Sequence, residues 1–390
     1  MKITDIREIA VPVNSNLRNA VFDFSQMTTS IVAVITDVVR DGAPVVGYAF
    51  NSTGRYACGA QMRNRLIPRI AKADAADLLN EAGDNIDPEK LLAVMLQGEK
   101  PGGHTERSIA VGTIEVALWD AVAKIEEKPL YRTIAERYSG GTSRQRMFVY
   151  VGGGWYAPGK GIPELLDEMR GYQEMGYTQL KMKVGGAPLT EDLARLEAVL
   201  ELVGDGQNLA VDANCGFDNA TALEYGHALA PYNLRWYEEP ADPLDFALIA
   251  QLAEFYEPPL ATGENLFSTQ DVRNLVRYSG MRPDRDVIQI DPPQSYGVTM
   301  MSRTLAMLAE HGWSPISVMP HGGNQMSLHI AAGFGLGLCE SYPNTFGMFS
   351  GFADDAEIID GYITLDDEQP GIGFEAQAEL YKIMSDLAAG

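Results

Sequence analysis

Cysteine is scarce in this chain, and long apolar runs are absent. The 390 residues include three cysteines, at 58, 215 and 339, too few and too scattered for a disulfide framework or a cysteine-based zinc site. This usage fits a reduced cytosol. No run reaches the ~18 apolar residues of a membrane span, and the first residues lack the pattern of a signal peptide. We therefore expect a cytoplasmic protein.

Positive charge is also in short supply. The chain has 30 lysines and arginines against 53 aspartates and glutamates, for a formal net charge of −23. Such a surface repels phosphate backbones and anionic lipid, so we expect neither a nucleic-acid nor a membrane partner. A small anion can still bind in a local basic pocket. The acidic surface and the chain length are compatible with a homo-oligomer.

No Gly-x-Gly-x-x-Gly turn opens a first helix, which disfavours a dinucleotide-binding sheet. The chain begins instead with apolar segments at 3–13, 30–39 and 45–50, the last two joined by an Asp41-Gly42 hairpin turn. Over 105–126 apolar residues recur with the period of a helix. Strands followed by helices indicate an α+β module, which we place at residues 1–130.

From about residue 147 short apolar strands alternate with amphipathic helices, the pattern of βα units on a parallel sheet. The candidate strands are 147–151, 179–183, 209–212, 235–238, 260–264, 287–291, 317–321 and 337–340. Eight parallel strands fit a closed barrel better than an open sheet. The predicted fold is therefore α/β, with a (β/α)7β TIM-type barrel at 131–359, the N-terminal α+β module, and a C-terminal segment, 360–390, that packs back on this module.

Three acidic residues each end a candidate strand. Asp212, Glu238 and Glu264 follow one another at intervals of 26 residues, one βα unit each. Any one of them alone is readily explained as a helix N-cap or a solvated loop residue. Together they meet at one mouth of the barrel, where their repulsion calls for a cation. Ligands that are all oxygen select a hard ion, and we expect Mg²⁺.

Charged or titratable residues also end the other candidate strands nearby. Lys181 and Lys183 share one face of their strand, and a second ammonium nearby disfavours protonation of Lys183, so that Lys183 can act as a base. Asp291 and His321 end two later strands. A hydrogen bond between them would raise the pKa of the histidine and create an acid/base pair. Glu340 ends the last strand.

These residues form an ordered set that resembles the signature of the enolase superfamily, mandelate racemase subgroup. The similarity also covers the N-terminal α+β module, which the resemblance implies is a capping domain, through Ala117-Leu118-Trp119-Asp120 and Lys128-Pro129-Leu130-Tyr131. Within the subgroup the chain is similar to the bacterial D-tartrate dehydratases. The motifs that carry the resemblance are Lys181-x-Lys183, Asp212-Ala213-Asn214, Glu238-Glu239-Pro240, Gly263-Glu264-Asn265, Asp291 and His321.

The resemblance implies a mechanism. One Mg²⁺ per subunit, held by the three acidic residues, binds the substrate carboxylate. Lys183 removes the α-proton, while Lys181 and Glu340 contact the carboxylate of the enediolate that forms. His321, held by Asp291, protonates the leaving β-hydroxyl. Loss of water then gives a 2-keto acid, which is oxaloacetate if the substrate is D-tartrate.

Other activities stay open to different degrees. The chain has no lysine between Lys183 and Lys382, which sets aside the relatives that carry a base on the sixth strand, namely cycloisomerases, dipeptide epimerases and enolase itself. Another acid-sugar dehydratase, or a mandelate-type racemase, would use the same residues. A non-catalytic ligand-binding barrel is the alternative outside enzyme chemistry.

Substrate specificity is expected to come from loops of the capping domain. The loops at 14–27 and 47–56 combine polar and aromatic residues with an arginine, which suits a hydroxy acid with a second carboxylate. Loops are also commonly polar for solvation alone, and the two readings remain open here. The candidate substrate contacts are Asn51, Arg55, Tyr56, Lys100 and Asn214.

Overall fold

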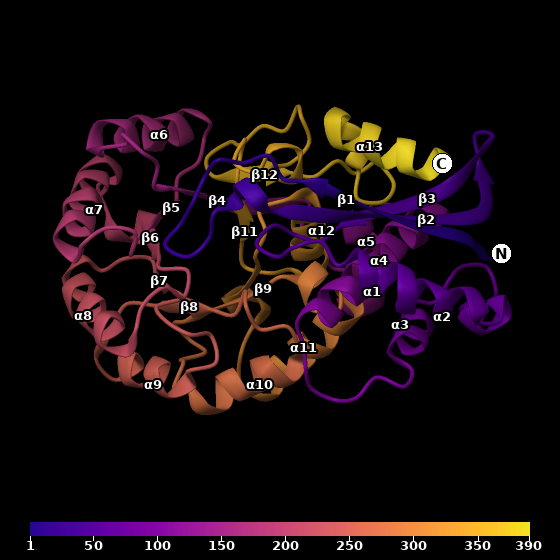
Figure 1. Cartoon of the computed structure of the whole chain (residues 1–390), viewed down its shortest axis with the longest axis horizontal. Coiled ribbons are helices and arrows are strands. Elements are labelled where there is room, and N and C mark those ends of the chain that lie inside the picture. The colour runs from indigo at the N-terminus through magenta and orange to yellow at the C-terminus, as the bar shows by residue number, and fades with distance from the viewer.

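The chain begins with a three-stranded antiparallel sheet, followed by a group of helices. The computed structural model describes residues 1–390 (Figure 1). The strands are β1 (Ile3–Pro12), β2 (Thr28–Arg40) and β3 (Ala43–Phe50), in the order β1-β2-β3. They confirm the predicted strands. The helices after them are α1 (Gly59–Gln61), α2 (Ile67–Lys72), α3 (Pro88–Leu96), α4 (Glu106–Ile125) and α5 (Leu130–Tyr138).

Helix α4 forms the centre of this first part of the chain. Nearly every residue from Ser108 to Ile125 is buried, and the helix packs against β3. The two backbones approach closely at Gly47, where a Cβ atom would lie 2.0 Å from the carbonyl oxygen of Ala117. A glycine is therefore required for this contact.

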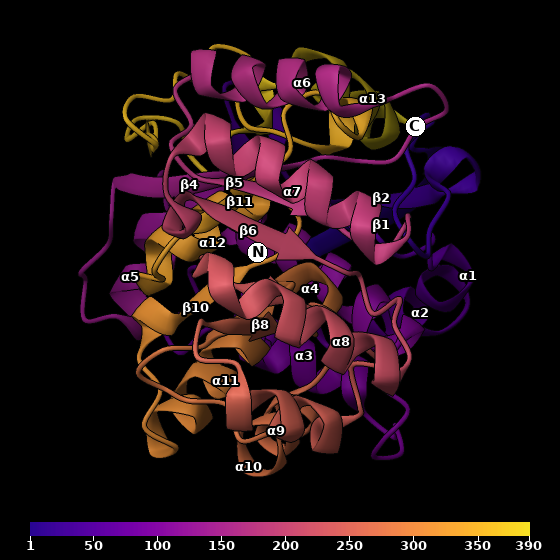
Figure 2. The same cartoon turned by 90° about the vertical axis from the view of Figure 1, so that its left-hand side faces the viewer.

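Eight parallel strands form a nearly closed barrel, as predicted (Figure 2). Neighbouring strands pair in the order β10-β9-β8-β7-β6-β5-β4-β11. Because helices cover the outside and side chains fill the inside, the short strands are buried on both faces. The strands are β4 (Arg146–Gly153), β5 (Leu180–Lys183), β6 (Leu209–Asp212), β7 (Tyr237–Glu238), β8 (Leu260–Thr262), β9 (Val287–Ile290), β10 (Val318–Pro320) and β11 (Cys339–Ser341).

The helices between these strands form the outer wall of the barrel, which Figure 1 shows from α6 round to α11. They are α6 (Ile162–Glu174), α7 (Leu189–Val203), α8 (Asn219–Leu229), α9 (Phe246–Phe255), α10 (Thr269–Tyr278), α11 (Val298–Glu310) and α12 (Gln325–Phe334). None of the helices combines the length and the apolar character that crossing a membrane requires.

The C-terminal segment contacts both parts of the chain. Strand β12 (Tyr362–Thr364) pairs antiparallel with β4 of the barrel. Further on, the carbonyl oxygen of Gly371 accepts a hydrogen bond of 2.7 Å from the backbone N–H of Leu130. The last helix, α13 (Ala378–Ala389), packs against β2 and β1, and both chain ends lie on that side of the molecule (Figure 1).

A buried carboxylate joins the N-terminal part to the barrel. Glu115 of α4 accepts hydrogen bonds from the backbone N–H groups of Val298 (2.7 Å) and Thr299 (2.9 Å), which open helix α11 of the barrel. The indole N–H of Trp119 donates a third, of 2.8 Å. A carboxylate at this position satisfies free N–H groups and complements the helix dipole. Glu115 therefore caps a helix that belongs to the other part of the chain.

Glu115→Gln should change how stability depends on pH. Burial raises the pKa of Glu115 to about 7, against the opposing effect of its N–H donors. Between pH 4.5 and about 7 the folded chain keeps this proton, whereas the unfolded chain, with its ordinary pKa of 4.5, has lost it. The free energy of unfolding therefore falls as the pH rises through this range. The free energy of unfolding is measured in urea for the variant and the wild type. From pH 4.5 to about 8 the difference between them should shift by up to about 3 kcal/mol in favour of the variant.

Glu310→Gln, an exposed substitution on α11, controls for the loss of one charge. If the free energies of unfolding of the wild type and Glu115→Gln varied with pH in parallel, the raised pKa of Glu115 would be contradicted.

Candidate active site

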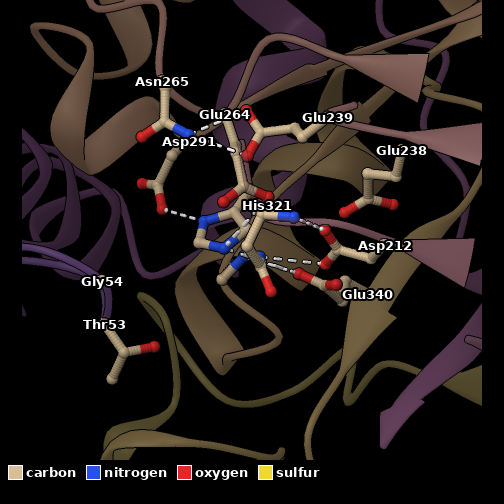
Figure 3. A network of polar contacts seen from close by, with 12 residues as sticks. Thr53, Gly54, Asp212, Glu238, Glu239, Glu264, Asn265, Asp291, His321 and Glu340 are labelled. Atoms are coloured by element: carbon tan, nitrogen blue, oxygen red, sulfur yellow. Dashed lines mark hydrogen bonds and ion pairs between the residues drawn. The ribbon is translucent and has the colours of Figure 1, made fainter. Parts of the chain in front are cut away.

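Three carboxylates converge at the mouth of the barrel (Figure 3). Strand pairing places Asp212 beside Glu238, and Glu264 follows the next strand, β8. One ligand oxygen from each lies within 4.8 Å of the others. Asp212 and Glu238 are fully buried, whereas Glu264 is partly exposed. The spacing of one βα unit in the sequence thus becomes proximity in space.

The charge balance of this cluster is suited to a hard divalent cation. Burial and the neighbouring Asp212 raise the pKa of Glu238 to about 8. Burial also disfavours ionisation of Asp212, but Lys183 and Lys181 outweigh it and hold the pKa of Asp212 below its ordinary value. A cation between the three groups would favour the ionised form of Glu238, and the donors are all oxygen. The residues present therefore fit such an ion.

The two lysines of β5 are buried among these acids. The ammonium of Lys181 contacts Glu238, Glu340 at 2.7 Å and Asp212 at 3.3 Å. Burial disfavours its charge, but Glu238 and Glu340 outweigh burial and raise the pKa of Lys181 well above its usual range. Lys183 donates to Oδ2 of Asp212 at 2.5 Å, and its Nζ lies 4.5 Å from the centre of the Trp155 ring.

His321 faces the lysines from the other side of the mouth. Its Nδ1 lies 2.8 Å from Oδ2 of Asp291, the partner expected from the sequence, and its Nε2 lies 3.6 Å from Glu264 and 4.0 Å from Glu340. Burial opposes the imidazolium, but Glu264, Asp291 and Glu340 outweigh it and raise the pKa of His321 to about 10. Glu340 in turn accepts hydrogen bonds from Tyr342 and from the backbone of Gly322.

A narrow cavity of about 40 Å³ opens above these groups. Lys183 and His321 both line it, and so does Asn214, whose side-chain oxygen has no hydrogen-bond partner. The loop after β3 contributes Thr53, Gly54 and Arg55 (Figure 3 shows the first two). The other lining residues are Asn19, Phe22, Phe24, Trp155, Glu239, Glu264, Asn265, Gln294, Tyr342 and Phe346.

Three of the candidate substrate contacts lie away from this cavity. The side chain of Asn51 is buried between β2 and its own loop, where it accepts from the backbone N–H of Ser30 and donates to the backbone oxygen of Arg55. Tyr56 is half exposed, at 53%. Lys100 is exposed, in a loop whose backbone oxygens bind Arg107.

Several residues of the cavity carry no clear signal in the sequence. Gln294 donates to the backbone oxygens of Ser52 and Thr53 and so fixes the loop after β3 above the barrel. Trp155 lies just after β4, and a residue at the end of a barrel strand could have been suspected on that ground alone. Glu239 and Asn265 each follow a carboxylate of the cluster directly and were predicted only as parts of motifs.

Comparison with known proteins agrees with this geometry. Residues 164–380 match the family model "Enolase C-terminal domain-like". The L-talarate/galactarate dehydratase of Salmonella typhimurium is 30% identical over 351 residues, 89% of this chain and 81% of its own. The arabinonate dehydratase of Saccharolobus solfataricus is 30% identical over 274 residues, 69% of this chain and 70% of its own. The S. typhimurium enzyme solved with Mg and L-lyxarohydroxamate has a TM-score of 0.74 at 27% identity, covering 94% of this chain and 88% of that one.

Lys181→Met should strongly destabilise the fold. It removes the cation that contacts both Glu238 and Glu340 in a fully buried position. Leaving buried carboxylates unpaired costs about 3–5 kcal/mol, to be measured as the free energy of unfolding in urea. Lys128→Met, which breaks an exposed pair with Glu136, is the control and should cost less than about 1 kcal/mol. Equal losses of unfolding free energy in the two variants would show that the buried ion pairs of Lys181 stabilise the fold no more than the exposed pair of Lys128.

Proposed function

We propose that this chain, which belongs to the enolase superfamily and its mandelate racemase/muconate lactonizing subgroup, is a Mg²⁺-dependent dehydratase of a hydroxy acid. The observation that carries the proposal is the arrangement of Lys183 and His321 in one cavity above three convergent carboxylates. The relatives reported above are dehydratases of acid sugars, which supports elimination of water over racemisation as the outcome.

Asp212, Glu238 and Glu264 are the proposed ligands of one Mg²⁺ per subunit. Their carboxylates supply only oxygen, and a relative of the same fold is solved with Mg. Bound there, the ion supplies positive charge that stabilises the charge developing on a substrate carboxylate. Lys181 and Glu340, which contact each other beside this position, are proposed to orient that carboxylate through a fixed ammonium and a fixed acceptor.

Lys183 and His321 are the proposed proton-transfer groups. Lys183 removes the α-proton on one side of the substrate. His321, through Nε2, gives a proton to the β-hydroxyl so that it leaves as water, and Asp291 orients the ring by accepting from Nδ1. The resulting enol becomes a 2-keto acid. One proton is thus taken, one is given, and one molecule of water is released.

The proposed substrate is D-tartrate, which would give oxaloacetate. The cavity is narrow, so a four-carbon acid needs less displacement of the capping loops than a six-carbon acid. Galactarate, named for one relative, is a hydroxy diacid as tartrate is. The unpartnered oxygen of Asn214 is placed to accept from a substrate hydroxyl. Asn51, Tyr56 and Lys100 belong, in this proposal, to the loops around the cavity.

The proposal extends to the organisation of the protein. We assign residues 1–130 to a capping domain, 131–359 to the catalytic barrel and 360–390 to a segment that completes the capping domain. The contacts of α13 with β1 and β2 support the last assignment. We further propose that the protein acts on a small hydroxy acid as a homo-oligomer in the cytoplasm.

Lys183→Ala and His321→Asn should separate the two proton transfers. Both variants should lose dehydration, because each removes a required acid or base. In D₂O with Mg²⁺, however, His321→Asn should still exchange the α-proton of the substrate for deuterium, since Lys183 remains, whereas Lys183→Ala should not. Proton NMR of the recovered substrate measures the exchange. Exchange that survives only in Lys183→Ala would reverse the two roles.

A substrate screen tests the activity itself. Four- and six-carbon hydroxy acids, with one or two carboxylates, are incubated with the purified protein and Mg²⁺, and 2-keto acids are detected as semicarbazones. Turnover of D-tartrate, lost with EDTA and restored by Mg²⁺, is the expected result. Turnover of six-carbon acids alone would overturn the choice of substrate, and no 2-keto acid from any of them would overturn the dehydratase proposal.

A further inference from the structure

We propose that Arg55 is the receptor for a second carboxylate of the substrate, so that the enzyme selects diacids over monoacids. This inference rests on the proposed function, because it concerns the same cavity. The relatives act, by name, on both kinds of acid: galactarate is a diacid and arabinonate a monoacid. Membership of the family therefore leaves this choice open, and the residues of the cavity have to decide it.

Arg55 differs from the other cations of the cavity in having no carboxylate partner. Lys183 is paired with Asp212, and His321 with Asp291. The guanidinium of Arg55 makes no ion pair within 4.0 Å; its Nη2 donates to the side-chain oxygen of Asn265, and a long contact of 3.4 Å joins Nη1 to the backbone oxygen of Gly54. Its remaining N–H groups have no protein partner. A positive charge with free donors is thus available in an otherwise acidic cavity.

The orientation of Arg55 is fixed by a relay of polar contacts. Asn265 donates through Nδ2 to both oxygens of the buried Glu239, at 2.8 and 2.9 Å, while its own oxygen accepts from Arg55. Figure 3 shows Asn265 and Glu239 facing each other beside the carboxylate cluster. The relay connects Glu239 to Arg55 through a neutral amide. It also holds one edge of the guanidinium and leaves the rest for a ligand.

Aromatic rings hold the guanidinium from the sides. Its carbon lies 5.0 Å from the centre of the Phe267 ring and 6.0 Å from that of Phe22. Phe22 comes from the first capping loop, and Phe267 follows Asn265 closely in the loop after β8. Such contacts favour arginine over lysine, because the flat guanidinium packs on rings and keeps its fork of donors in a fixed plane.

The position of Arg55 relative to the proposed metal ligands suits a short diacid. Asn265 directly follows Glu264, so the relay begins one residue from the carboxylate cluster. A substrate with one carboxylate at the cluster and its α-carbon between Lys183 and His321 would direct its other end towards the capping loop that carries Arg55. A carboxylate there gains charge-assisted hydrogen bonds, which a CH₂OH group cannot match.

The experiment compares D-tartrate with the threonate of matching configuration, in which a CH₂OH replaces one carboxylate. For Arg55→Gln we expect kcat/KM for tartrate to fall about 10- to 100-fold, the effect of losing a charged hydrogen bond, with little change for threonate. Arg55→Lys should recover part of the loss. Arg170→Gln, an exposed arginine of α6 in a pair with Asp167, is the matched control. Equal losses for both acids, or none, in Arg55→Gln would overturn the inference.

A binding measurement separates this inference from the proposed function. Calorimetry with Mg²⁺ compares succinate and butyrate, neither of which has a hydroxyl to eliminate. Tighter binding of succinate by the wild type, lost in Arg55→Gln, supports the inference even if no acid is dehydrated, a result that would refute only the dehydratase proposal. Equal binding of the two acids by the wild type would overturn the inference. So would a selective loss for diacids in Lys100→Gln with none in Arg55→Gln.

Discussion

The mouth of the barrel depends on the mutual neutralisation of charges that are almost wholly removed from water. Lys181 is completely buried and stays charged only because Glu238, Glu340 and Asp212 surround it. In the same way, Asp212 stays ionised because two ammonium groups face it. None of these groups is independent, since removing any one changes the balance of buried charge around the others. The barrel therefore holds its reactive side chains in place through their own electrostatics as well as through packing.

Strand register and the capping loops turn this cluster into a cavity of defined shape. Parallel pairing sets Lys183 beside Asp212 and Asp212 beside Glu238, so neighbouring strands deliver neighbouring charges. Over them, Gln294 donates to the backbone of the loop that follows β3, and Glu115 attaches the long helix α4 to helix α11 of the barrel wall. Both ties use buried hydrogen bonds between distant parts of the chain. The loop above the cavity and the central helix of the N-terminal part are consequently attached to the barrel.

Much of this could be predicted because apolar strands and their polar ends leave a periodic trace in the sequence. The eight barrel strands were located in this way, although β8 ends at Thr262, two residues earlier than predicted, before Gly263 with its φ of 128°. The proximity of Asp212, Glu238 and Glu264 followed from spacing alone. The contact of Arg55 with Asn265 joins residues 210 apart and has no periodicity, and the exclusion of Lys100 from the cavity depends on loop conformation. Such contacts can be identified only in the three-dimensional structure.

The relay from Glu239 through Asn265 to Arg55 has a consequence for how enzymes of this kind diverge. Arg55 lies on a loop of the kind that changes readily in evolution, yet its side chain donates to Asn265 of the barrel, which in turn donates to Glu239. A replacement that cannot donate would leave the side-chain oxygen of Asn265 without this partner, so a lineage that abandons this arginine should also change at Asn265. Positions 55 and 265 are thereby expected to change together, and paired changes there would mark branches of the family in which this contact has been rebuilt.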